Sequence, residues 1–141
     1  MSRAIGINHV AVEVADLDEA LAFFDSLFDG VRLRGRSRRM AFVDLGDQFI
    51  ALEQAREPVA AGHFGLVVDD CPETMRRART AGWRVVGDND VLDPSGNHWQ
   101  VVDYRDVQFT KAPRVLEGMG LGGLVKSDAA IGELQAKGLA G

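Results

Sequence analysis

The stretch Ile5-Gly-Ile-Asn-His9-Val-Ala-Val-Glu-Val-Ala-Asp16-Leu-Asp-Glu19-Ala-Leu21 decides the fold. From His9 to Val14, valines alternate with other side chains, which is the pattern of a half-buried strand. Asp16 then precedes Glu19 by three residues, the spacing of a helix N-cap, and an apolar helical stripe follows. The stretch therefore predicts a strand that leads directly into a helix.

The same pattern returns in His63-Phe-Gly-Leu-Val-Val-Asp-Asp70-Cys-Pro-Glu73-Thr-Met75. His63 aligns with His9, and the helix-capping Asp70 aligns with Asp16. A histidine and a helix cap that recur at one spacing indicate two copies of one strand–helix module.

Each copy continues with three further strand candidates, so the order in each is strand, helix, strand, strand, strand. We expect the helices at 17–29 and 72–81, because Gly30 and Gly82 suit the position after a helix. The predicted fold class is α+β, with two βαβββ modules. The expected organisation is one domain over residues 1–104, comprising module one at 5–53 and module two at 62–104, and a C-terminal extension at 105–141 with a short helix at 128–137.

The composition excludes several classes of protein. With 141 residues and 46% hydrophobic side chains, the chain can bury one sizeable core. A net charge of −5 argues against nucleic-acid partners and against anionic membranes. No apolar run has the length of a membrane span or a secretory signal, and the single cysteine forms no intramolecular disulfide. We expect a soluble cytoplasmic protein.

The two βαβββ modules, each with a histidine on its first strand, resemble the vicinal oxygen chelate superfamily, which includes glyoxalase I, extradiol dioxygenases and bleomycin-resistance proteins. The resemblance covers residues 5–104 and is carried by three stretches: Asn8-His9-Val-Ala-Val, Gly62-His63-Phe-Gly-Leu-Val-Val and Asp93-Pro-Ser-Gly-Asn-His-Trp-Gln-Val. It implies a cupped mixed sheet and a homodimer, since members of the superfamily commonly pair.

The resemblance also implies a metal site. Ligands in metal-using relatives come from the first and last strands of each module, which here are His9, His63 and Gln100, whereas the matching position in module one is Ala51. A divalent Zn, Ni, Mn or Fe(II) ion suits nitrogen and oxygen donors of this kind. Relatives usually carry glutamate where Gln100 stands, so the site loses a charged donor. Structural histidines in the core are the alternative for His9 and His63.

Neighbouring side chains on the same strand faces complete the expected cleft. Side chains two residues apart share a face, so we expect the substrate to be bound by Phe49, Ala51, Glu53 and His98. Glu53 and His98 could also replace a missing metal ligand, or be polar residues at a strand end or near a turn.

Two classes of function are the main alternatives, and an interaction or regulatory domain is a third. One is an enzyme that binds a small oxygenated metabolite, with the ion as Lewis acid in a lyase- or isomerase-like step; no catalytic residue is assigned. The alternative is a metal-free module of the bleomycin-resistance type that binds or sequesters a small molecule. Glycines 118, 120 and 123 match a G-x-G-x-x-G pattern, but no good strand precedes them, so we expect no nucleotide cofactor.

Overall fold

Each module forms its own open four-stranded sheet in the computed structural model, which describes residues 1–56 and 58–139. Module one comprises β1 (His9–Val14), α1 (Leu17–Leu27), β2 (Leu33–Arg36), β3 (Met40–Asp44) and β4 (Phe49–Gln54). Module two comprises β5 (His63–Val68), α2 (Cys71–Thr80), β6 (Arg84–Val86), β7 (Asp90–Leu92) and β8 (His98–Asp103). The strand orders β1-β4-β3-β2 and β5-β8-β7-β6 are equivalent, and the predicted α+β fold of two βαβββ modules is confirmed.

The two helix caps form as the sequence predicts. The carboxylate of Asp16 accepts a hydrogen bond from the amide of Glu19 at 2.9 Å, and Asp70 accepts one from the amide of Glu73 at 3.0 Å. Helix α1 ends at Leu27, two residues earlier than expected, because Phe28 adopts extended backbone angles while its side chain packs against the core.

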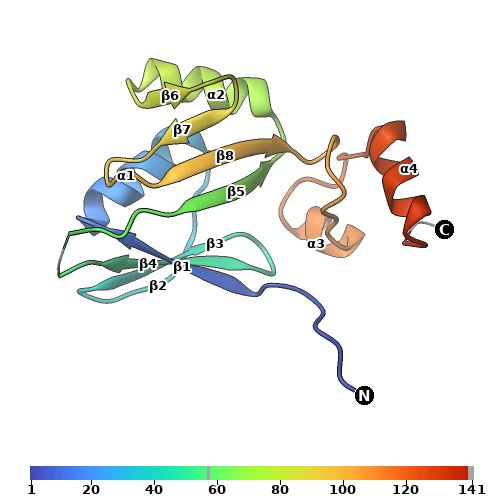
Figure 1. Cartoon of the computed structure of the whole chain (residues 1–141), viewed down its shortest axis with the longest axis horizontal. Coiled ribbons are helices and arrows are strands. Elements are labelled where there is room, and N and C mark those ends of the chain that lie inside the picture. The colour runs from blue at the N-terminus through green and yellow to red at the C-terminus, as the bar shows by residue number, and fades with distance from the viewer. Residues whose placement is uncertain (57, 140–141) are drawn as a thin grey trace.

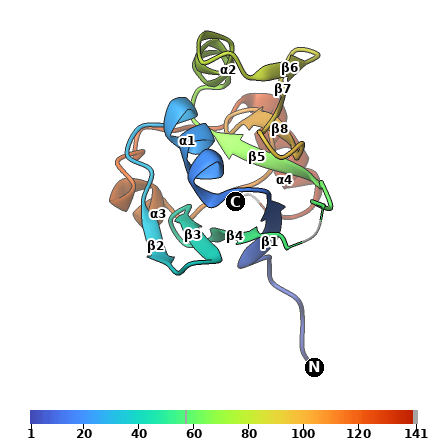
Figure 2. The same ribbon diagram turned by 90° about the vertical axis from the view of Figure 1, so that its left-hand side faces the viewer.

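One hydrophobic core joins the two modules. It contains Val12 of β1 and Leu66 of β5. The ring of Phe24 on α1 packs edge to face against that of Trp99 on β8, with ring centroids 5.2 Å apart. The sheets lie one above the other, with α1 at the level between them and α2 against the second sheet (Figures 1 and 2). Because side chains alternate along a strand, each sheet has one face toward this core and an outer face directed away from it.

A buried asparagine ties the modules together. Asn97 precedes β8 and is fully buried. Its amide nitrogen donates to the main-chain carbonyl of Glu13 at 2.8 Å and to Asp93 at 3.0 Å, while its oxygen accepts from the amide of Gly62 at 2.8 Å. The start of β8 is thereby fixed to the end of β1.

The C-terminal tail lies at one end of the two sheets (Figure 1). It contains α3 (Pro113–Gly118), which the sequence did not reveal, and α4 (Asp128–Ala136), which lies where a short helix is expected. The ammonium of Lys126 anchors the tail by donating to the carbonyls of Tyr104, Val107 and Phe109. Within the described residues, no helix has the length and apolar character needed to cross a bilayer.

Candidate functional site

Four polar side chains gather on the outer face of the second sheet. His63 on β5 pairs in register with His98 on β8, and Asp90 on β7 pairs with Gln100 two residues further along β8. Partners in register project to the same side of a sheet, and residues two apart on one strand do so too. The backbone ladder therefore places all four on one face.

The four side chains contact one another. The rings of His63 and His98 stack with centroids 4.3 Å apart and planes 12° from parallel. Nε2 of His98 lies 2.7 Å from a carboxylate oxygen of Asp90, and Nε2 of His63 lies 3.4 Å from the amide oxygen of Gln100. The side chains of His98 and Asp90 are 31% and 26% exposed, and His63 and Gln100 are exposed, so ions and small molecules can reach the group.

The outer face of the first sheet is aromatic instead. The ring of His9 stacks on Phe49, with centroids 4.7 Å apart and an interplanar angle of 8°. The ring of Phe42 packs edge to face against that of Phe49, with ring centroids 5.8 Å apart. The guanidinium of Arg34 lies 4.5 Å from the centre of the Phe49 ring. Such a surface suits flat or apolar ligands, with Arg34 available to a carboxylate.

The register shows which positions of the two modules correspond. Ala51 pairs with the residue two after His9, as Gln100 pairs with the residue two after His63. The internal alignment of Ala51 with Gln100 therefore holds in the structure. By the same rule, Phe49 corresponds to His98, and Phe42 corresponds to Asp90.

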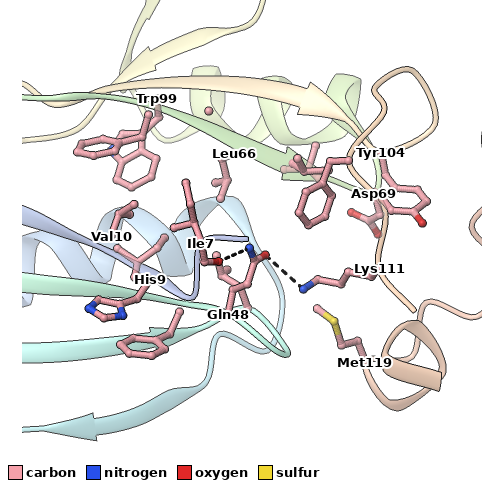
Figure 3. A pocket seen from close by; sticks show the side chains of 18 of the residues that line it. Ile7, His9, Val10, Gln48, Leu66, Asp69, Trp99, Tyr104, Lys111 and Met119 are labelled. Carbon is pink, nitrogen blue, oxygen red and sulfur yellow. Dashed lines mark hydrogen bonds between the residues drawn. The ribbon is translucent and has the colours of Figure 1, made fainter. Parts of the chain in front are cut away.

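The structure of one chain divides the predicted site between the two outer faces. It brings His63, Gln100 and His98 together, whereas His9 lies on the first sheet and does not join them. Val10 points toward Trp99, and the neighbouring His9 points away from it (Figure 3).

The remaining predicted residues also lie on the first sheet. Ala51 is 3% exposed and lies between Ala11 and Phe42, and Glu53 is exposed near the end of β4. A cleft that contains all the predicted residues therefore requires the outer faces of both sheets.

Sequence reasoning missed Asp90. Its signal is weak, because β7 is only three residues long, but Val91 is buried and its neighbour Asp90 must then face outward. Among the described residues, His63, Asp90 and His98 form a group whose ligand atoms all lie within 4.8 Å of one another. Two imidazoles and a carboxylate fit a divalent transition ion, whereas Ala51 offers no donor and Gln100 offers a neutral one.

A cavity of about 440 Å³ lies between the two sheets and the C-terminal tail, and its lining also includes His9, Phe49 and His63. Its lining is mainly apolar, and Figure 3 shows Leu66 and Trp99 on one side and Met119 of the tail on another. At the polar end, Lys111 donates to Asp47 and lies 3.5 Å from the oxygen of Gln48. The hydrogen bond from Lys111 lowers the pKa of the Asp47 carboxyl.

The fold and the matched modules identify the family. Residues 6–101, more than half of the chain, match the Glyoxalase/Bleomycin resistance protein/Dioxygenase superfamily, and the chain belongs to it. No protein among the curated sequences matches the chain.

Solved structures of known proteins share the fold at low sequence identity. Lactoylglutathione lyase from Agrobacterium tumefaciens is 23% identical, with 72% of this chain and 96% of that one covered and a TM-score of 0.60. The oxidase ChaP-H2 is 19% identical, with coverage of 70% and 93% and a TM-score of 0.56. A bleomycin resistance determinant encoded on the transposon Tn5 is 17% identical, with coverage of 73% and 98% and a TM-score of 0.53. Their names span different chemistries, so the likeness defines the fold alone.

Proposed function

We propose that this protein binds a small oxygenated molecule at the outer face of the second sheet, where a divalent metal ion serves as Lewis acid in a lyase- or isomerase-like reaction. The observation that supports this is the contact group of His63, Asp90, His98 and Gln100 on an accessible face. Polar side chains that converge at an accessible surface and can still form hydrogen bonds with a ligand are typical of a ligand site.

The proposed cleft is completed by a second copy of the chain. The polar and aromatic outer faces point away from the core that they share, so one chain cannot enclose a ligand between them. In the proposed homodimer, the aromatic face of one copy lies opposite the polar face of the other. The predicted set of His9, His63 and Gln100 can meet only in such an arrangement, with His9 contributed by the second copy.

The side chains have distinct roles in this proposal. The imidazoles of His63 and His98 offer nitrogen donors, and the amide of Gln100 can donate an N–H to a ligand oxygen. Phe49 gives the opposite wall an apolar surface. A bound divalent ion would supply polarisation of two adjacent ligand oxygens.

The experiment is a binding screen followed by NMR. The full chain is titrated with hydroxyketones, 2-oxo acids and catechols, each with and without Zn²⁺, and backbone amide signals are monitored. We expect a ligand with adjacent oxygens to shift β5 and β8 signals and to lose affinity in His63→Ala. The matched control is Glu19→Gln on the exposed side of α1, which should bind normally. If ligands bind equally well to His63→Ala, the proposal is wrong.

A second candidate function is metal-free sequestration of an apolar molecule. The observation that favours it is the cavity of about 440 Å³, which falls within the size range of ligand pockets. In this case an anionic aromatic probe such as anilinonaphthalene sulfonate would bind without metal. Its binding would shift signals of Trp99 and Met119, which line the cavity, and would leave those of Asp90 and Gln100, which do not line it, unchanged.

A further inference from the structure

The outer face of the second sheet carries a ligand set that differs from the one that the sequence predicts. We propose that module two by itself binds one divalent transition-metal ion, with His63, Asp90 and His98 as the protein ligands. This inference deepens the proposed function and rests on it for the role of the ion. The ligand set itself can be tested with metal alone.

The backbone holds the three ligands in place. They lie on β5, β7 and β8, adjacent strands of one sheet, and their ligand atoms are within 4.8 Å of one another. Bonds of about 2.1 Å to one ion would set these atoms roughly 3.3 Å apart. The ligand atoms of His98 and Asp90 are already 2.7 Å apart, so an ion would separate this pair slightly and bring in His63, whose ring contacts that of His98 on the same face.

The hydrogen bond between His98 and Asp90 marks a place for a cation. Nε2 of His98 and a carboxylate oxygen of Asp90 lie 2.7 Å apart, within hydrogen-bond distance. A divalent ion held by both atoms would take the place of this hydrogen bond. Two imidazoles and one carboxylate favour Zn²⁺, Ni²⁺, Fe²⁺ or Mn²⁺ over Ca²⁺ and Mg²⁺, which prefer oxygen donors.

The first module provides an internal comparison. It has the same register, and His9 stacks on Phe49 as His63 stacks on His98. Phenylalanine, however, stands at both positions that correspond to His98 and Asp90. The two modules thus share a backbone framework and one histidine, but only module two has the donors for an ion.

The set is displaced from the expected one by two residues along β8. His98 precedes Gln100 by two residues, which is the period of side-chain alternation in a strand, so both lie on the same face. The displaced set restores the carboxylate charge, through Asp90, that Gln100 cannot supply. The amide oxygen of Gln100, 3.4 Å from Nε2 of His63, then borders the ion site.

The test is titration calorimetry of the untagged, metal-stripped full chain with ZnCl₂ and with NiCl₂. We expect one ion per chain, and a loss of affinity of at least about tenfold in His98→Phe and in Asp90→Asn. His98→Phe installs the residue of module one and preserves the ring stack. Glu19→Gln, on the exposed side of α1, is the control and should bind as the wild type does. Absorption spectra with Co²⁺ report the ligand set independently.

The outcomes separate this inference from the proposed function. Wild-type affinity in both His98→Phe and Asp90→Asn, or no ion bound by the wild type, would overturn the inference. Loss of binding in His9→Ala and Gln100→Ala, with binding kept in His98→Phe, would also overturn it and support the sequence-predicted set. If metal binds as proposed here but no oxygenated ligand binds, the inference holds and the proposed function fails. Circular dichroism verifies folding, and His98→Gln replaces His98→Phe if that variant unfolds.

Discussion

Asn97→Ala should weaken the attachment of the two modules to each other. The side chain makes three hydrogen bonds, to the carbonyl of Glu13, the amide of Gly62 and the carboxylate of Asp93. The Glu13 carbonyl lies in module one, the other two partners lie in module two, and Asn97 itself is 0% exposed. Alanine would leave partners without a hydrogen bond in a place that water does not readily enter.

The size of the effect follows from the number of bonds. Each buried hydrogen bond contributes about 1 kcal/mol net, so the loss of three predicts destabilisation by about 3 kcal/mol. Native domains are stable by only about 5–15 kcal/mol, so a loss of this size is easily measured. A variant that retains β8 but loosens its start should also show faster amide exchange at Gly62.

Urea unfolding at neutral pH, followed by circular dichroism, measures the change. Ser95→Ala is the matched control, because the Ser95 hydroxyl also joins the modules but makes one exposed bond, to the amide of Ala15 at 2.8 Å. We expect the control to lose about 0.5–1 kcal/mol. An Asn97→Ala midpoint equal to that of Ser95→Ala, with an unchanged slope, would refute the assigned role of Asn97.

Three further predictions concern other parts of the chain. Arg76 and Arg77 lower the pKa of Glu73 to about 2 from 4.5, so its stabilising effect is present above the unfolded value and is lost as the pH falls toward 2. Glu73→Gln should therefore lose less stability between about pH 5 and about pH 3 than the wild type in acid titrations of urea midpoints. Burial raises the pKa of the Cys71 thiol, so a thiol reagent should label it slowly at neutral pH and rapidly in urea; equal rates would contradict its burial. Lys126→Met removes donors to three carbonyls of the loop after β8, so limited proteolysis should cut the tail faster than in the wild type, and an unchanged rate would argue against the anchor.

The sequence determined the repeated parts of the fold well. Alternating valines defined β1, and the paired caps at Asp16 and Asp70 fixed the starts of the two helices. Trp99 precedes Gln100 by one residue and therefore lies on the opposite face of β8, and it is buried. These features depend on neighbours in the chain, and local patterns are enough to predict them.

The arrangement of the candidate site could not be predicted in the same way. Alternation shows which face of a strand is buried, but not which surface packs against it, so it could not show that His9 and His63 lie on different outer faces. Asp90 was not predicted as a site residue, because its position near His98 depends on the pairing of β7 with β8. Helix α3 begins at Pro113 without a side-chain cap, and its signal in the sequence is correspondingly weak.

The contrast between the two outer faces has a consequence for the arrangement of a dimer. In a twofold dimer that opposes unlike faces, the two clefts are equivalent, and every chain supplies one polar and one aromatic wall. If like faces met instead, a dimer would hold one cleft with two polar groups and no aromatic wall. Both assemblies hold one polar group per chain, so contact of a bound ligand with an aromatic wall as well as a polar one distinguishes the first assembly from the second.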